Sequence, residues 1–241
     1  MSISFELEYD PPIGEIIKLS ESVVTITAPN ASPMTFKGTQ TYIIGDGCEV
    51  ALIDPGPNIE SHLTAIKKAL VGKKLLAVLI THSHIDHSPL ARPISKIYEV
   101  PIYAYGRSGK GKSSIMEKYT RGVELGGGEG IDYNFNPDVL ISSGDHLSCS
   151  SWIIEALHTP GHMSNHLCFS LNKGEALFSG DLVMGWATTL ISPPDGDIAQ
   201  YKDSMSKLLG RSENPYFPGH GGPIKNAKKM VLVVGLVIII L

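Results

Sequence analysis

The chain has 241 residues, of which 42% are hydrophobic and 18% are charged, and its formal net charge is −4. This length suffices for one domain with a substantial core, and the lack of an overall basic field disfavours RNA as a partner, since binding would need a local basic patch. Three cysteines, Cys48, Cys149 and Cys168, are an odd number with no CxxC pair, which argues against a disulfide framework and for a reducing compartment.

Short β-branched runs bounded by Gly, Pro, Asn and Asp predict the strands. In chain order these lie at 22–27, 41–44, 50–53, 75–80, 102–105, 152–157 and 176–178. Apolar residues at helical spacing predict two helices, at 59–71 and 198–209. Strands interleaved with helices indicate a mixed α/β fold, in which helices lie outside a sheet or a pair of sheets.

The stretch THSHIDHS directly follows the predicted strand 75–80 and places His82, His84, Asp86 and His87 within six positions. Two histidines spaced by two residues are a weak signal, but four ligand-type side chains together are a strong one. Burying them without partners would cost several kcal/mol, and a bound divalent cation compensates for that cost. We therefore predict a metal site at the end of this strand.

Three further ligand-type residues, His162, Asp181 and His220, each follow a predicted strand and lie next to a glycine. A glycine lets the backbone turn sharply, so that the neighbouring side chain can project into a shared cleft. Together with THSHIDHS they make five histidines and two aspartates. That set is too large for one tetrahedral zinc ion and suits two.

The ordered motifs HxHxDH, TPGH, FSGD and PGHGGP resemble those of the metallo-β-lactamase superfamily, and the resemblance runs from about residue 20 to 225. It implies an αββα sandwich, two mixed β-sheets face to face with helices outside and the metals at one edge. The implied ligands are His82, His84 and His162 for the first metal, Asp86, His87 and His220 for the second, and Asp181 bridging both.

Imidazoles and carboxylates without a thiolate suit Zn(II), and also Fe(II) or Mn(II). We predict two zinc ions per chain, because superfamily members with di-iron chemistry carry a Glu where this chain has His84. Such a pair would acidify a bridging water to hydroxide and polarise the scissile bond, while Asp86 orients the nucleophile and accepts its proton. The sequence thus predicts a metal-dependent hydrolase of an ester, thioester, lactone or phosphodiester.

Two residues are candidates for supporting the ligands. Asp54, in LIDPGP, ends a strand at the metal edge, and its family counterpart supports the ligand loop by hydrogen bonding; an ordinary turn before Pro55 and Gly56 explains it equally well. His166 could be the partner of a ligating imidazole, or simply a packed or exposed histidine. Both alternatives stay open.

The segment GRSGKGKS at 106–113 matches the phosphate-binding template GxxxxGKS and follows a predicted strand. We do not expect nucleotide hydrolysis there, because the carboxylates that could hold Mg²⁺, Asp54 and Asp181, belong to the predicted metal site. We interpret Arg107, Lys110 and Lys112 as a basic rim that steers an anionic small-molecule substrate.

The two ends of the chain bear on domains and localisation. No basic stretch followed by an apolar one begins the chain, so we predict no signal peptide and expect a cytoplasmic protein. We assign residues 1–229 to the metallo-β-lactamase-fold domain and treat 230–241, MVLVVGLVIIIL, as an apolar tail. This tail is either a buried strand or helix, a degenerate membrane anchor, or a frameshift product. Because a membrane helix needs roughly 20 apolar residues, we expect no stable insertion.

Within the superfamily, ALFSGDLVMGW and PYFPGHGGPI look most like the glyoxalase II-like and β-lactamase-like protein 2 branches, the latter including an endoribonuclease. Both branches continue with helices after PGHG, whereas we expect the apolar tail to replace them, so the sequence names no substrate and no oligomeric state. The alternatives to a dinuclear hydrolase are a mononuclear iron persulfide dioxygenase of the same fold, which the intact second site disfavours, and a non-catalytic or truncated member.

Overall fold

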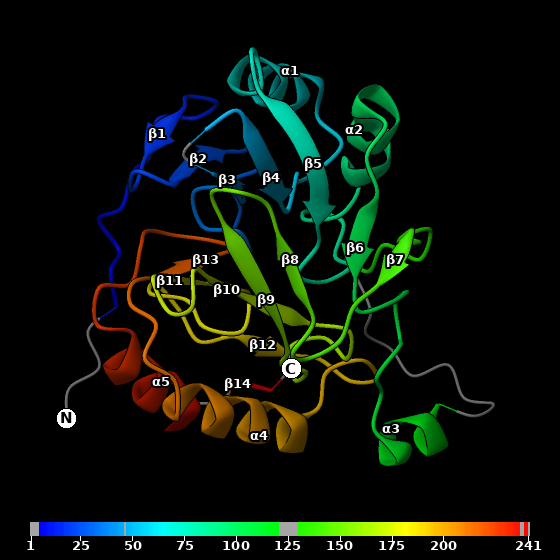
Figure 1. Cartoon of the computed structure of the whole chain (residues 1–241). Helices are drawn as coiled ribbons and strands as arrows, with labels where there is room; N and C mark the ends of the chain where they lie inside the picture. The colour runs from blue at the N-terminus through cyan, green and yellow to red at the C-terminus, as the bar shows by residue number, and fades with distance from the viewer. Residues whose placement is uncertain (1–4, 46, 121–129, 237–238, 241) are drawn as a thin grey trace.

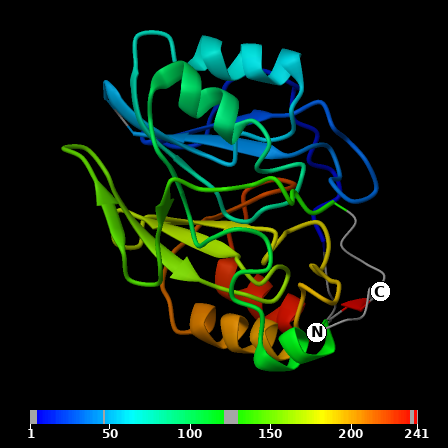
Figure 2. The same cartoon turned by 90° about the vertical axis from the view of Figure 1, so that its right-hand side faces the viewer.

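The computed structural model describes residues 5–45, 47–120, 130–236 and 239–240. Among these residues, two β-sheets lie face to face, and helices cover the outer face of each (Figures 1 and 2). Figure 2 separates the four layers, with α1 and α2 on one side and α4 and α5 on the other. The predicted αββα sandwich is confirmed.

The first sheet has its strands in chain order from β1 to β7. They are β1 Ile17–Lys18, β2 Val23–Thr27, β3 Gln40–Ile44, β4 Glu49–Ile53, β5 Lys74–Leu79, β6 Ile102–Ala104 and β7 Val139–Leu140. Strands β4 to β7 are mutually parallel. The carboxyl ends of β4 and β5 therefore meet at one edge, where ligand-binding loops gather in α/β sheets. Helices α1 (Glu60–Ala69) and α2 (Ala91–Tyr98) follow these two strands.

The second sheet has the order β13-β11-β10-β9-β8. Its strands are β8 His146–Ser148, β9 Ile153–His158, β10 Leu167–Leu171, β11 Ala176–Gly180 and β13 Tyr216–Pro218. Strand β11 pairs in parallel with β13, so the chain leaves both at the same end. The remaining described elements are α3 Ser114–Tyr119, β12 Leu190–Ile191, α4 Ile198–Leu209, α5 Ala227–Leu236 and β14 Ile239–Ile240.

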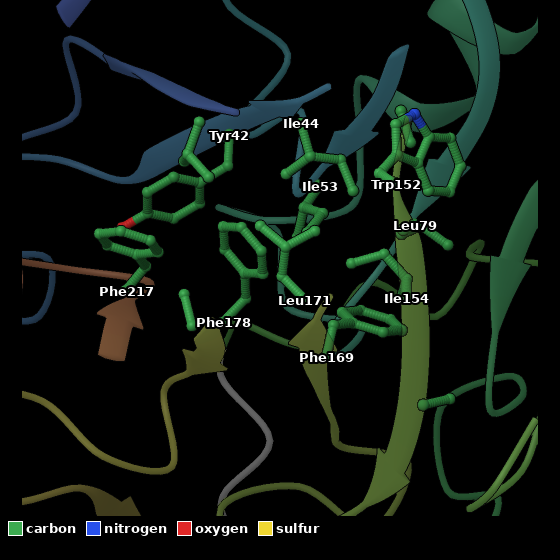
Figure 3. Close-up of a cluster of buried hydrophobic side chains, with 14 of the residues drawn as sticks. Tyr42, Ile44, Ile53, Leu79, Trp152, Ile154, Phe169, Leu171, Phe178 and Phe217 are labelled. Atoms are coloured by element: carbon green, nitrogen blue, oxygen red, sulfur yellow. The ribbon is translucent and has the colours of Figure 1, made fainter. Parts of the chain in front are cut away.

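The main core lies between the two sheets (Figure 3). Because side chains alternate along a strand, Tyr42 and Ile44 of β3 face this core while Ile43 faces the helices α1 and α2. Strand β10 is built in the same way, with Phe169 facing inward and Cys168 facing the α4 and α5 layer. Both faces of each sheet are thus covered by buried apolar side chains. Polar side chains that could bind a ligand therefore lie at the edges of the sheets.

The predicted strands and helices occur with shifts of one or two residues, and 198–209 matches α4. Strand β10 and helix α2 were missed. Helix α2 contains Pro93 in its first turn, a position where proline is tolerated because the amide hydrogen needs no helical partner. The other missed strands have two or three residues, too few for a periodic pattern to appear.

Of the alternatives left open for the apolar tail, the structure has a buried helix at Ala227–Leu236, so the expectation that the tail replaces the helices after PGHG was wrong. Residues 227–236 form α5, and Val231 and Val234 are buried against α4 in a cluster with Tyr201 and Met205. Apolar residues at helical spacing bury against that helix, and this packing outweighs the strand preference of the β-branched side chains. Strand β14 pairs in parallel with β12. In the described part of the chain, no helix has the length and apolar character needed to cross a membrane.

Candidate metal centre

Loops from both sheets bring the predicted ligands together at one edge of the sandwich. His82, His84, Asp86 and His87 follow β5 of the first sheet, whereas the other three ligands come from the second sheet. These are His162 after β9, Asp181 after β11 and His220 after β13. The seven side chains form two groups, each able to offer its ligand atoms to one ion: His82, His84, His162 and Asp181, and Asp86, His87 and His220.

In the first group, three ring nitrogens converge. His84 Nδ1 lies 3.0 Å from His82 Nε2 and 3.1 Å from His162 Nε2. Nitrogens that share a tetrahedral zinc lie roughly 3.3 Å apart, because each Zn–N bond is about 2.0 to 2.1 Å. The Oδ2 atom of Asp181 completes the group at 3.9 Å from His82 Nε2 and 3.7 Å from His162 Nε2.

In the second group, Asp86 Oδ2 lies 3.1 Å from His220 Nε2 and 3.5 Å from His87 Nε2. Asp181 stands between the two groups, with Oδ1 3.5 Å from His87 Nε2 and Oδ2 3.3 Å from His220 Nε2. This position agrees with the bridging role implied by the resemblance.

The protein fixes four of the five histidines in one tautomer. Since carbonyl and carboxylate oxygens only accept, Nδ1–H of His87 donates to Asp54 Oδ2 (3.0 Å), that of His162 to Leu190 O (2.7 Å) and that of His220 to Gly38 O (3.3 Å). The Thr81 hydroxyl donates to Asp54, so it accepts from His82 Nδ1–H at 2.9 Å. Each of the four rings is left with a basic Nε2 facing the cluster, as a metal ligand requires.

Two buried atoms of the cluster, His87 Nε2 and Asp181 Oδ1, have no hydrogen-bond partner among the described residues. Leaving such atoms unsatisfied is costly, and a cation would satisfy both. The donor set therefore fits metal ions, and imidazole with carboxylate and no thiolate suits zinc or iron.

The electrostatics of the cluster point the same way. Burial, reinforced by the neighbouring His162, lowers the pKa of His84 to about 3. Burial also acts to lower the pKa of His220, but the attraction of Asp181 and Asp86 outweighs it and raises this pKa to about 9. The pKa of Asp181 is held well below its usual value, against the effect of burial, by His220 and His87. The carboxylates of Asp86 and Asp181 therefore stay ionised and attract positive charge into a buried site.

Asp54 occupies the predicted supporting position. It directly follows β4 with a positive φ of 47° and accepts hydrogen bonds from Thr81 N (2.8 Å), Thr81 Oγ1 (2.6 Å) and His87. These contacts hold the first residue of THSHIDHS and one of its imidazoles. His166 is fully buried and stacks on His82 with ring centroids 5.2 Å apart, while its Nδ1 bonds to Thr159 Oγ1 at 3.0 Å. Of the two alternatives left open for His166, the structure shows the packed histidine, because its contact with the ligands is ring packing.

Several supporting groups were missed by sequence reasoning. Thr39 Oγ1 lies 3.5 Å from Asp86 Oδ2 and accepts a 2.8 Å hydrogen bond from Asn30 Nδ2. The carbonyls of Gly38 and Leu190 carry no side-chain signal at all. Gly219 is required sterically, because a Cβ there would collide with the Asp181 carboxylate and the His87 ring. In the sequence, the glycine before His220 in PGHG is the only feature that indicates this close approach.

The basic segment 106–113 is fastened to its surroundings. Lys112 Nζ lies 3.9 Å from the buried Asp195, Ser113 caps α3 and donates to Asp197 at 2.6 Å, and Arg107 donates to Asn136 at 2.7 Å. Ser108 Oγ lies 2.7 Å from Ser83 Oγ within the metal motif. The segment therefore braces the metal loop. Of the three predicted rim cations, Lys110 is exposed and forms no ion pair among the described residues.

Residues 34–220 match the family model of the metallo-beta-lactamase superfamily. The chain belongs to this superfamily. It is 31% identical over 226 residues to an atrochrysone carboxyl ACP thioesterase of Aspergillus fumigatus, covering 92% of this chain and 62% of that protein. It is also 28% identical to a beta-lactamase-like protein 2 homolog of Caenorhabditis elegans, covering 91% of this chain and 68% of that one. The predicted superfamily is thus confirmed, and β-lactamase-like protein 2 homologs are among the relatives that the chain resembles.

Solved structures of the superfamily agree with this fold. A metallo-beta-lactamase family protein from Thermus thermophilus superposes with a TM-score of 0.71 at 19% identity, covering 91% of this chain and 80% of that one. A beta-lactamase domain protein from Burkholderia ambifaria gives a TM-score of 0.73 at 19% identity, with 94% and 76% covered. The superfamily fold, and a histidine and aspartate cluster able to bind metal, are therefore established for this chain.

Proposed function

We propose that this superfamily member is a dinuclear, zinc-dependent hydrolase that cleaves a thioester or carboxylic ester of an anionic small molecule. The observation that carries the proposal is the sharing of Asp181 between two groups of ligands from opposite sheets. The first group of ligands would hold one ion through His82, His84 and His162. The second group would hold the other ion through Asp86, His87 and His220.

When bound, the two ions supply a water of lowered pKa and polarise the scissile carbonyl. The protein's own part is to orient and to accept a proton. Asp86 stays ionised, because His87 and His220 lower its pKa against the effect of burial, so its carboxylate can take the proton of the attacking water. In the overall reaction the water oxygen bonds to the acyl carbon, the C–S or C–O bond breaks, and the leaving thiol or alcohol recovers a proton.

The choice of thioester among the predicted bonds is supported by the relatives. Three of them are named atrochrysone carboxyl ACP thioesterases, from Aspergillus fumigatus, Paecilomyces divaricatus and Aspergillus chevalieri. Because the chain spans 60 to 62% of their lengths, their full activity is carried over only as a proposal. The exposed Lys110 beside the metal loop would favour a substrate with negative charge.

A hydrolysis panel tests the proposal. Zinc-loaded protein would be assayed with an acyl thioester, S-lactoylglutathione, a homoserine lactone, single-stranded RNA and a chromogenic cephalosporin, and its metal content measured. We expect two zinc ions per chain, thioester cleavage and no consumption of O₂. One iron per chain in the protein as purified, with O₂ consumption when a persulfide is added, would instead identify a persulfide dioxygenase. Zinc-loaded protein inactive on the whole panel would favour a non-catalytic member.

A further inference from the structure

Two aromatic rings from distant parts of the chain stack on one another beside the metal centre. Phe36 lies in the loop between β2 and β3, and Trp186 lies in the loop after β11. Their ring centroids are 4.9 Å apart and their planes differ by 10°. Both side chains are only partly buried, so the pair belongs to the surface and not to the core.

Contacts on both sides place this pair next to the second group of ligands. A Cβ at Gly221, the residue after His220, would lie 2.9 Å from Trp186 Cδ1. On the other side, Gly38, two residues after Phe36, accepts a 3.3 Å hydrogen bond from His220 Nδ1. The loops that carry the two rings thus both contact the segment of His220, and a substrate held at that group would have the stacked pair beside it.

The loop backbone keeps Phe36 in this position under strain. Phe36 has φ 54°, a left-handed conformation that bulky side chains rarely adopt, and a hydrogen bond of 2.9 Å from Gly38 N to Thr35 O closes the turn around it. Such outliers persist where the surrounding structure enforces them, and they cluster at ligand sites. Met34, on the same turn, is 57% exposed, which extends the apolar character of the loop.

We propose that Phe36 and Trp186 form a wall that binds the acyl part of the substrate, and that this wall selects aromatic acyl groups over short aliphatic ones. The inference rests on the proposed thioester hydrolysis and names the substrate class of that site. A flat aromatic acyl group would pack against the stacked rings while its carbonyl lies at the metal ligands, whereas an acetyl group has no aromatic surface for such packing. Aromatic packing of this kind is worth about tenfold in affinity.

The first test compares kcat/KM for the 1-naphthoyl and acetyl thioesters of N-acetylcysteamine in zinc-loaded wild type, Trp186→Leu and Phe36→Leu. We expect each substitution to lower the naphthoyl-to-acetyl ratio about tenfold, mainly through KM for the naphthoyl substrate. The control is Tyr119→Leu, which removes an aromatic ring that is 64% exposed on α3 and should leave the ratio unchanged. An unchanged ratio in both pair variants, at equal zinc content, would overturn the proposal, and so would an equal loss on both substrates.

The second test does not depend on turnover. The chain has two tryptophans, and Trp152 is buried in the core, so a fluorescence change on adding 1-naphthoate reports on Trp186. We expect saturable quenching in the wild type, no such signal in Trp186→Leu, and weaker binding in Phe36→Leu. If the wild type cleaves neither thioester but shows this quenching, the proposed hydrolysis fails while the aromatic wall stands. Absence of quenching in zinc-loaded wild type would refute the wall.

Discussion

Asp54 Oδ2 lies 3.0 Å from His87 Nδ1, and this contact determines which ring nitrogen of His87 faces the ligand cluster. Asp54 is itself held by two hydrogen bonds from Thr81, so the carboxylate has little freedom to turn. Partners of this kind raise the basicity of a ligating imidazole and fix its orientation.

Replacing this carboxylate should therefore weaken metal binding without removing a ligand. We expect Asp54→Asn to lower zinc affinity about 10- to 100-fold, because the amide is a poorer acceptor for the His87 N–H. Competition with a chromogenic chelator measures the change. The matched control is Asp203→Asn on the exposed face of α4, which should bind zinc like the wild type. Equal affinity of the Asp54 variant would contradict this role.

Direct removal of a ligand should have a larger effect. Both His84→Ala and Asp181→Ala are expected to lose bound metal and hydrolysis together, since His84 belongs to the first group and Asp181 touches both. Elemental analysis after gel filtration, run beside the activity assay, checks this. His146→Ala, an exposed histidine on β8, serves as control. Full activity of a metal-free preparation of either ligand variant would refute the metal-dependent mechanism.

Thr39 offers a finer test of how Asp86 is oriented. Its hydroxyl lies 3.5 Å from Asp86 Oδ2 and is anchored by Asn30. Thr39→Val keeps the shape but removes this donor, and we expect kcat to fall about three- to tenfold, the effect of one hydrogen bond. Thr39→Ser should retain most of the activity. Steady-state kinetics at matched zinc content compares kcat of the variants. A valine variant as active as the serine variant would show that the Thr39 hydroxyl does not orient Asp86.

His62 should make stability depend on pH. It is buried behind β3, with Nε2 2.8 Å from Thr41 Oγ1, and burial lowers its pKa to about 4. The unfolded chain, with an ordinary histidine pKa, binds this proton more readily than the folded protein, so stability is retained above about pH 6.5 and declines as the pH falls towards 4. The decline attributable to His62 is about 1.4 kcal/mol per pH unit.

Urea unfolding of metal-free wild type and His62→Gln between pH 4 and 7 measures this slope. Other buried histidines contribute to both proteins, so the difference between the two slopes isolates His62. Parallel curves for wild type and variant would show that the protonation of His62 does not differ between folded and unfolded states.

The inter-sheet core gives a prediction about stability alone. Phe169 is fully buried between the sheets, near Phe178 and Leu171 (Figure 3). Phe169→Ala should lower the free energy of unfolding by about 3 to 5 kcal/mol, since it combines lost apolar burial with a cavity. Val71→Ala, at an exposed position, should change it by less than about 0.5 kcal/mol. Chemical denaturation monitored by circular dichroism compares the two.

Much of the fold and of the metal centre could be predicted because the signals are local. His82, His84, Asp86 and His87 are neighbours in the chain, and the strand before them has a clear apolar run. The more distant His162, Asp181 and His220 could be added because each combines a ligand side chain with a turn-forming glycine. Helix α5 could not be told from a strand, because its β-branched residues favour a strand until α4 is there to pack against.

Other parts of the site could not have been predicted from residue types. The carbonyl oxygens of Gly38 and Leu190 hold His220 and His162, and any residue would supply the same atom. The stacking of Phe36 on Trp186 depends on how two separate loops meet, which no local pattern encodes. The GRSGKGKS segment gave a phosphate-binding signal, yet its serines tie the loop to the metal motif, through Ser108, and to Asp197, through Ser113.

The origin of the ligands in both sheets has a consequence for the lifetime of the protein as well as for its chemistry. Metal ions held at this cluster would be bound by ligands from both sheets, so they would favour only the state in which the sheets are docked. Each bound ion then adds stability that grows with the logarithm of the free metal concentration, about 2.7 kcal/mol at one hundred times its dissociation constant. If the proposed ions are bound, the free metal concentration would therefore affect how much of the protein is folded, before any substrate is met.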